Sequence, residues 1–169
     1  MVSRVSEVRG IVRKGIEDPK SVFLEIKKMA QNYDWKVREV AATALVEISK
    51  KRPEEVIEEM ELWASEGDSN VKRAASEGLR SMARKEPEKV LPVLEKLKTD
   101  SSPYVRKSVA NALRNAGRKN PDLILQVCGK WAKLKNPNTN WIIEGGLRKI
   151  REVHPRKAGK VLKSLEGKE

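Results

Sequence analysis

The chain of 169 residues has few cysteines, histidines and aromatic residues, and it lacks any long apolar run. Its single cysteine, Cys128, excludes an internal disulfide. Its single histidine, His154, leaves no Cys/His cluster at metal-binding spacing and no Ser-His-Asp arrangement. No window predicts a transmembrane helix or a signal peptide. We therefore expect a cytoplasmic protein with no metal, no cofactor and no membrane partner.

Alternating apolar and polar residues, the pattern of a half-buried strand, are also missing. Charged residues make up 36% of the chain and aromatic residues 4%. A thin aliphatic core with much charged surface is typical of a two-layer helical solenoid. The abundance of Lys and Glu beside few Gln favours a thermophilic source.

A strict period of 34 residues is present instead. Five prolines follow it: Pro19, Pro53, Pro87, Pro121 and Pro155. A leucine column follows the same step: Leu45, Leu79, Leu113 and Leu147. A third column contains only residue types that cap helix N-termini: Asp34, Asp68, Ser102 and Asn136. A fixed period in this range without insertions indicates a stacked repeat array.

Each repeat is predicted to hold two helices. Proline is tolerated at the first position of a helix, so each periodic proline opens one helix, and each capping residue opens the other. The polar cap, then Val37-Arg38, then small residues resembles a HEAT repeat. We predict an all-α fold, an α-solenoid (α-α superhelix) of five HEAT-like helical pairs. It forms a single domain over 1–169, with repeats at about 1–33, 34–67, 68–101, 102–135 and 136–169.

The net charge of +12 is distributed unevenly along these repeats. Residues 35–69 contain five basic and nine acidic residues, whereas residues 104–137 contain eight basic residues and one acidic residue. This asymmetry indicates a polyanion partner that contacts the last three repeats.

The polar face of the cap-opened helices carries much of that charge. In the third repeat the face holds Arg73, Glu77, Arg80 and Arg84; in the fourth, Lys107, Asn111, Arg114 and Arg118; in the fifth, Trp141, Gly145 and Arg148. Stacking should align Arg80, Arg114 and Arg148 in one row of a basic concave trough that suits duplex phosphates. The competing interpretation is a solvated surface, since cations in last helical turns also offset the helix dipole.

Three segments resemble the HEAT-like DNA alkylation repair family, and its AlkC branch most of all. They lie at 71–80, 104–113 and 141–148, and the resemblance covers about residues 34–153. The family implies a DNA glycosylase that excises cationic N3- or N7-alkylated purines from double-stranded DNA without metal or cofactor.

The resemblance and the polar face together assign roles to particular side chains. Glu77 is the expected catalytic carboxylate, which would stabilise an oxocarbenium-like sugar, and Trp141 is the expected stacking residue. The alternatives are a helix salt bridge of Glu77 with Arg73 or Arg80, and packing of Trp141 on a neighbouring helix. The expected nucleic-acid-binding residues are Arg73, Arg80, Arg84, Lys107, Asn111, Arg114, Arg118 and Arg148.

The chain departs from the family pattern at Pro103, at Arg114-Asn115 and at Glu144-Gly145-Gly146. Two glycines in mid-helix require either a close approach of another element or a bent helix. These departures leave three functions open. The first is an active glycosylase, and the second is a non-catalytic relative that binds DNA or RNA. The third is a protein-interaction scaffold that uses the acidic helix at 53–65 or an apolar groove as its contact surface. We expect a monomer.

Overall fold

The computed structural model describes residues 4–167, and that part of the chain contains twelve α-helices and no strand. It confirms the predicted all-α solenoid. The helices are α1 (Arg4–Glu17), α2 (Lys20–Ala30), α3 (Trp35–Ser49), α4 (Pro53–Trp63), α5 (Ser69–Glu77), α6 (Arg80–Lys85), α7 (Pro87–Leu97), α8 (Pro103–Lys119), α9 (Pro121–Ala132), α10 (Pro137–Gly146), α11 (Arg148–Val153) and α12 (Pro155–Leu165).

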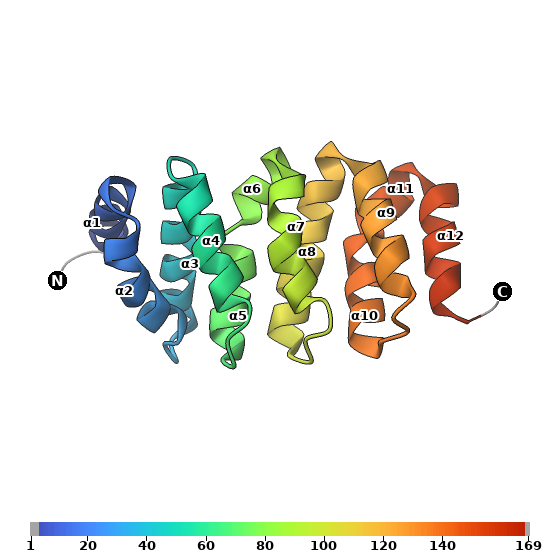
Figure 1. The fold of residues 1–169 in the computed structure, drawn as a ribbon, viewed down its shortest axis with the longest axis horizontal. Coiled ribbons are helices and arrows are strands. Elements are labelled where there is room, and N and C mark those ends of the chain that lie inside the picture. The colour runs from blue at the N-terminus through green and yellow to red at the C-terminus, as the bar shows by residue number, and fades with distance from the viewer. Residues whose placement is uncertain (1–3, 168–169) are drawn as a thin grey trace.

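The helices form two layers that run the length of the molecule (Figure 1). One layer, here called the cap layer, consists of α1, α3, α5 with α6, α8, and α10 with α11. The other, the proline layer, consists of α2, α4, α7, α9 and α12. Successive members of the cap layer pack directly on one another, and neighbours in the proline layer meet less extensively. Closer spacing in the cap layer favours curvature of the solenoid towards that layer.

The periodic prolines and capping residues start helices as the sequence predicts. Prolines occupy the first turn of α4, α7, α9 and α12. The Asp68 side chain accepts from the backbone N–H groups of Asn70 and Val71, at 2.8 and 3.1 Å. Ser102 differs from the other members of its column, because its side chain makes no capping bond to α8.

The core contains the apolar columns of both layers. Trp63 and Trp131, which belong to one column, are both buried, and each indole N–H donates to a glutamate at the surface. Cys128 is buried as well, and burial raises the pKa of its thiol to about 12. A buried thiol with a raised pKa is a poor nucleophile.

Two of the ten predicted helices are split in two, which explains the count of twelve. One break lies at Gly78 and Leu79, between α5 and α6, and the other at Leu147, between α10 and α11. A Cβ at Gly78 would lie 2.9 Å from Leu45, and a Cβ at Gly146 would lie 2.8 Å from Leu113. This column reads Gly10, Ala44, Gly78, Ala112 and Gly146 along the chain. The unsplit helices α3 and α8 carry alanine in it, and α1 carries Gly10, whose Cβ position is open, and is not split either.

Side-chain bonds between successive repeats keep them in register. Arg73 pairs with Glu39, Lys89 with Glu54, and Lys157 with Asp122, at N–O distances of 2.6, 3.1 and 2.8 Å. Each pair joins residues 34 or 35 positions apart. Equivalent positions of neighbouring repeats are therefore adjacent in space.

Candidate nucleic-acid interface

Four of the predicted cationic side chains are exposed on the cap layer. Among residues 4–167 none of the four has a hydrogen bond or an ion pair through its side chain. They are Arg84 of α6, Lys107 and Arg118 of α8, and Arg148 of α11. Unpaired exposed cations can bind an anionic ligand without first breaking an ion pair.

Two other arginines that were predicted to contact nucleic acid, Arg73 and Arg80, lie near a carboxylate of the acidic second repeat. Arg73 Nη2 lies 2.6 Å from Glu39 Oε1, and Arg80 Nη1 lies 4.0 Å from Glu39 Oε2. Glu39, Arg73 and Lys107 occupy one column of the repeat. The sequence could have revealed the first pair, since opposite charges stand one period apart.

Arg114 lies deeper than its neighbours in the predicted row. Its guanidinium donates to the carbonyl of Gly145 at 2.9 Å and to Asn111 Oδ1 at 3.4 Å. Burial, and then the positive charge of Arg148, lower the pKa of Arg114. The absent side chain at Gly145 lets α10 approach α8 closely here, because a Cβ there would lie 3.1 Å from the Cβ of Ala110.

Glu77 is held between two helices of the cap layer. Its side chain is 13% exposed. The hydroxyl of Ser108 on α8 donates to Oε1 at 2.8 Å, and Arg80 Nη1 lies 3.4 Å from Oε2. Of the two arginines that the sequence offered as partners for Glu77, Arg80 is the one that pairs with it, while Arg73 turns to Glu39. The carboxylate is thus fixed in position, with one edge directed at α8.

Trp141 is 40% exposed, and a cation that the sequence analysis did not select lies over its ring. The Arg106 guanidinium on α8 is 5.2 Å from the ring centroid. At this distance the pair makes a cation–π interaction. The Nε of Arg106 is buried and has no hydrogen-bond partner among the described residues. Arg106 and Trp141 stand one period plus one residue apart in the sequence, and this spacing could have indicated that they are neighbours.

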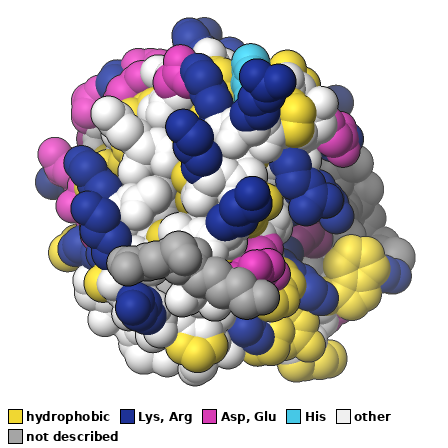
Figure 2. Space-filling model, turned by 90° about the vertical axis from the view of Figure 1, so that its right-hand side faces the viewer, with side chains coloured by type: hydrophobic (Ala, Val, Ile, Leu, Met, Phe, Trp, Pro, Cys, Tyr) yellow, Lys and Arg dark blue, Asp and Glu magenta, His cyan; other side chains and the backbone are white. Residues whose placement is uncertain are grey.

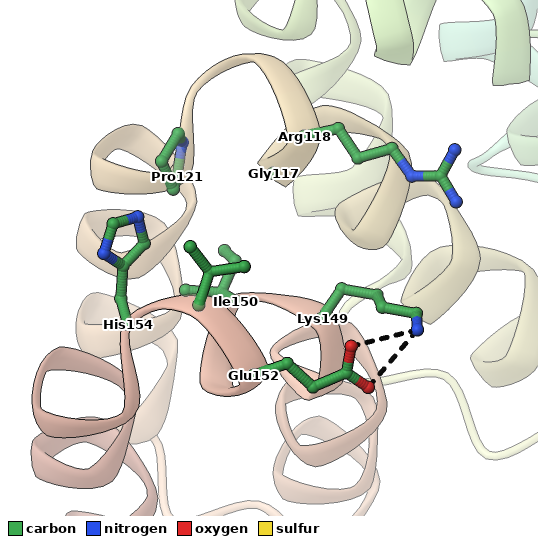
Figure 3. A pocket seen from close by; sticks show the side chains of 8 residues that line it. Gly117, Arg118, Pro121, Lys149, Ile150, Glu152 and His154 are labelled. Atoms are coloured by element: carbon green, nitrogen blue, oxygen red, sulfur yellow. Dashed lines mark hydrogen bonds and ion pairs between the residues drawn. The ribbon is translucent and has the colours of Figure 1, made fainter.

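A pocket of about 310 Å³ lies where α8 and α9 meet α11 and α12. Figure 3 shows His154 on one side of it and the Lys149–Glu152 ion pair on the other, with an Nζ–Oε2 distance of 3.0 Å. A smaller pocket occupies the equivalent place two repeats earlier, where it is lined by Pro53, Met82 and Glu86 among others. Both pockets accompany a short helix that follows a split.

Within residues 4–167, no group of three or more His, Cys, Asp and Glu side chains is placed to hold a metal ion. The same part of the chain has no helix whose length and apolar content would let it cross a bilayer. Basic side chains dominate the C-terminal end of the molecule (Figure 2).

A family model described as DNA alkylation repair enzyme matches residues 11–139. The chain belongs to this family. The matched residues include both cap-layer helices that hold Glu77 and Ser108, and they extend as far as the start of α10. No curated protein matches the chain.

Three solved structures of similar fold agree with the family assignment. One is the Pseudomonas fluorescens alkylpurine DNA glycosylase AlkC bound to DNA containing an abasic site analog. It has a TM-score of 0.80 and 26% identity over 94% of this chain and 45% of its own. AlkD2 from Streptococcus mutans has a TM-score of 0.73 and 29% identity over 86% of this chain and 72% of its own.

The third structure is smu.31 from Streptococcus mutans UA159, with a TM-score of 0.68 and 30% identity. The match covers 78% of this chain and 68% of that one. This DNA alkylation repair family member spans less than half the length of the AlkC chain.

Proposed function

We propose that the protein binds duplex DNA along the cap layer of its last three repeats and excises cationic N3- or N7-alkylated purines. The observation that carries the proposal is the set of exposed, unpaired cations on α6, α8 and α11, in a chain of the DNA alkylation repair family. A carboxylate and an aromatic ring, Glu77 and Trp141, belong to the same layer.

The cap layer is the wall that we assign to the concave side, because its helices pack more closely than those of the proline layer. Arg84, Lys107, Arg118 and Arg148 would contact phosphates directly. Each such interaction releases counterions from the duplex, which makes the affinity depend on salt. Arg114 would add its positive charge beside Arg148 and would not contact a phosphate itself, because its guanidinium donates to the carbonyl of Gly145.

Excision of an alkylated purine makes modest chemical demands. The base already carries a positive charge and leaves readily, so the enzyme has to stabilise a cationic sugar and orient a water. A carboxylate held in a fixed position does the first electrostatically. The bonds from Ser108 and Arg80 hold Glu77 in this way. Trp141 would stack on the sugar or the base with the part of its ring that Arg106 leaves open.

The test is release of 3-methyladenine or 7-methylguanine from alkylated duplex DNA, measured together with DNA affinity over a range of salt concentrations. Arg118→Glu/Arg148→Glu should weaken binding and reduce the salt slope by about 0.9 for each phosphate that the variant no longer neutralises. Arg9→Glu/Arg13→Glu, on exposed positions of α1, makes the same charge change and serves as the control. Equally weakened binding in the two double variants would refute the assigned surface.

A second candidate is a non-catalytic DNA-binding relative, and the position of Glu77 favours it. The bonds to Ser108 and Arg80 give that carboxylate a purely structural use as a link between α5 and α8. This alternative predicts tight, salt-dependent binding without base release. Glu77→Gln separates the two. An active enzyme that uses Glu77 loses base release while its DNA affinity changes little, whereas an unchanged release rate removes Glu77 from the mechanism.

A further inference from the structure

A second basic surface lies on the other layer of the molecule. A groove of about 700 Å³ lies between α9 and α12. Both helices lie near the C-terminal end of the molecule (Figure 1). Residues that line it include Gly129, Lys133, Lys135, Lys160, Lys163 and Ser164. Both helices belong to the proline layer, so the groove is separate from the cations of the cap layer.

The four lysines of this groove have no acidic partner. Among residues 4–167, no ion pair or side-chain hydrogen bond involves any of their ammonium groups. The helix α12 itself contains no acidic residue. Some other lysines on this layer are neutralised, as Lys89 is by Glu54 and Glu86. The groove therefore keeps its whole positive charge for a ligand.

Lys135 stands at a position whose backbone conformation favours another residue type. Its φ is 49°, in the left-handed region, and it lies in the turn that follows α9. Glycine and asparagine adopt this conformation at lower cost than lysine does. A lysine that stands here, on the groove wall, is explained by a role for its ammonium group.

Gly129 is the opposite case, a glycine where a helix favours another residue. It lies inside α9, and a Cβ built on it would meet nothing within 4 Å. Unlike Gly78 and Gly146, it therefore makes no room for another part of the fold. Glycine in a helix interior is unfavourable relative to alanine. Close approach of a ligand to the backbone would explain it.

We propose that this groove binds the phosphodiester backbone of a second segment of duplex DNA. Lysine ammonium groups are compact charges that bind phosphate oxygens without demanding a fixed geometry. A concave groove with a bare backbone wall suits a ridge of phosphates better than it suits the flat surface of a bilayer. This inference stands apart from the proposed function, because it uses residues of the other layer.

The test is a titration of the intact protein with a short duplex at low salt, followed by sedimentation to count the duplexes bound per chain. Lys160→Glu/Lys163→Glu should abolish one binding event. Lys20→Glu/Lys28→Glu, at exposed positions on α2 and the same layer, makes the same charge change and should abolish none. Equal binding by the two double variants would overturn the proposal.

The same titration separates this site from the cap layer. If both surfaces bind DNA, Arg118→Glu/Arg148→Glu also loses one event and the combination of both double variants loses both. If the cap layer does not bind DNA, that variant changes nothing and the lysine variant alone abolishes binding. Vesicles of phosphatidylserine and phosphatidylcholine form a further arm. Lysine-dependent capture by vesicles, with DNA binding unaffected by Lys160→Glu/Lys163→Glu, would identify a membrane and overturn the proposal.

Gly129→Ala gives a second measurement that does not alter charge. Alanine fits at this position, so the variant should unfold at a higher temperature than the wild type and yet bind the second duplex more weakly. Gly159→Ala in α12 is the matched control, because that glycine also has open space around its Cβ position but does not line the groove. Unchanged DNA binding by Gly129→Ala would refute the close approach.

Discussion

Replacing Glu39 with Gln should strengthen DNA binding, because that carboxylate competes with phosphate for an arginine. Glu39 lies 2.6 Å from Arg73 and 4.0 Å from Arg80. Arg80 keeps Glu77 as a partner at 3.4 Å, so the substitution frees Arg73 alone. One added phosphate interaction increases the salt slope by about 0.9, which corresponds to roughly fivefold tighter binding at 0.15 M salt. The decrease in stability should be small, about 0–1 kcal/mol, because both side chains are partly exposed.

The measurement is duplex affinity at several salt concentrations between 50 and 200 mM, a range in which the slope is well determined. Glu58→Gln is the control, since Glu58 is an exposed carboxylate of α4 on the proline layer and its replacement changes the net charge equally. Tighter binding confined to Glu39→Gln, with a steeper slope, supports the assigned surface. The same increase in both variants would mean that net charge alone sets the affinity, and the reasoning from Arg73 would be wrong.

Three further predictions concern packing, titration and the carboxylate. Gly146→Ala should destabilise the fold by about 1–3 kcal/mol, since its Cβ would lie 2.8 Å from a leucine of α8, whereas Gly159→Ala should not; thermal unfolding compares them. The Cys128 thiol, with a pKa raised to about 12, should resist alkylation at pH 8 in the native protein, and its contribution to the free energy of unfolding should fall as pH rises from about 9 to 12. Ser108→Ala should release Glu77 and lower the rate of base release more than the DNA affinity, measured in the same assays.

The sequence predicted the architecture because the period is a property of each repeat and needs no knowledge of long-range contacts. Steps of 34 residues place the prolines and capping residues at helix starts, and the structure has helices there. The split of two helices was not predicted. The paired glycines at 145 and 146 signalled either a close approach or a bend, and both occur, since α8 packs closely against them and α10 ends there.

The candidate site was less predictable, because whether a cation is free or ion-paired depends on its neighbour in the adjacent repeat. Arg73 and Arg118 look alike on a helical projection, and the difference between them is Glu39, one period away from Arg73. Arg106 was overlooked because it lies beside the selected face of its own helix, and only the packing of α10 on α8 brings Trp141 over it. Columns of the repeat would have shown the first pair, whereas Trp141 shares its column with Lys107 and stands one residue beyond the column of Arg106.

One column of the repeat, Gly10, Ala44, Gly78, Ala112 and Gly146, distinguishes odd-numbered from even-numbered repeats. Glycine and alanine alternate, and each of the last two glycines accepts a leucine from the repeat before it. Duplication of a single repeat would place two glycines or two alanines of this column in neighbouring repeats. A copy of the fourth repeat, for example, would bring an alanine against Leu113, where there is room only for glycine. Insertion or deletion of repeats in twos would preserve every such packing arrangement, so relatives of this chain should differ in length by even numbers of repeats.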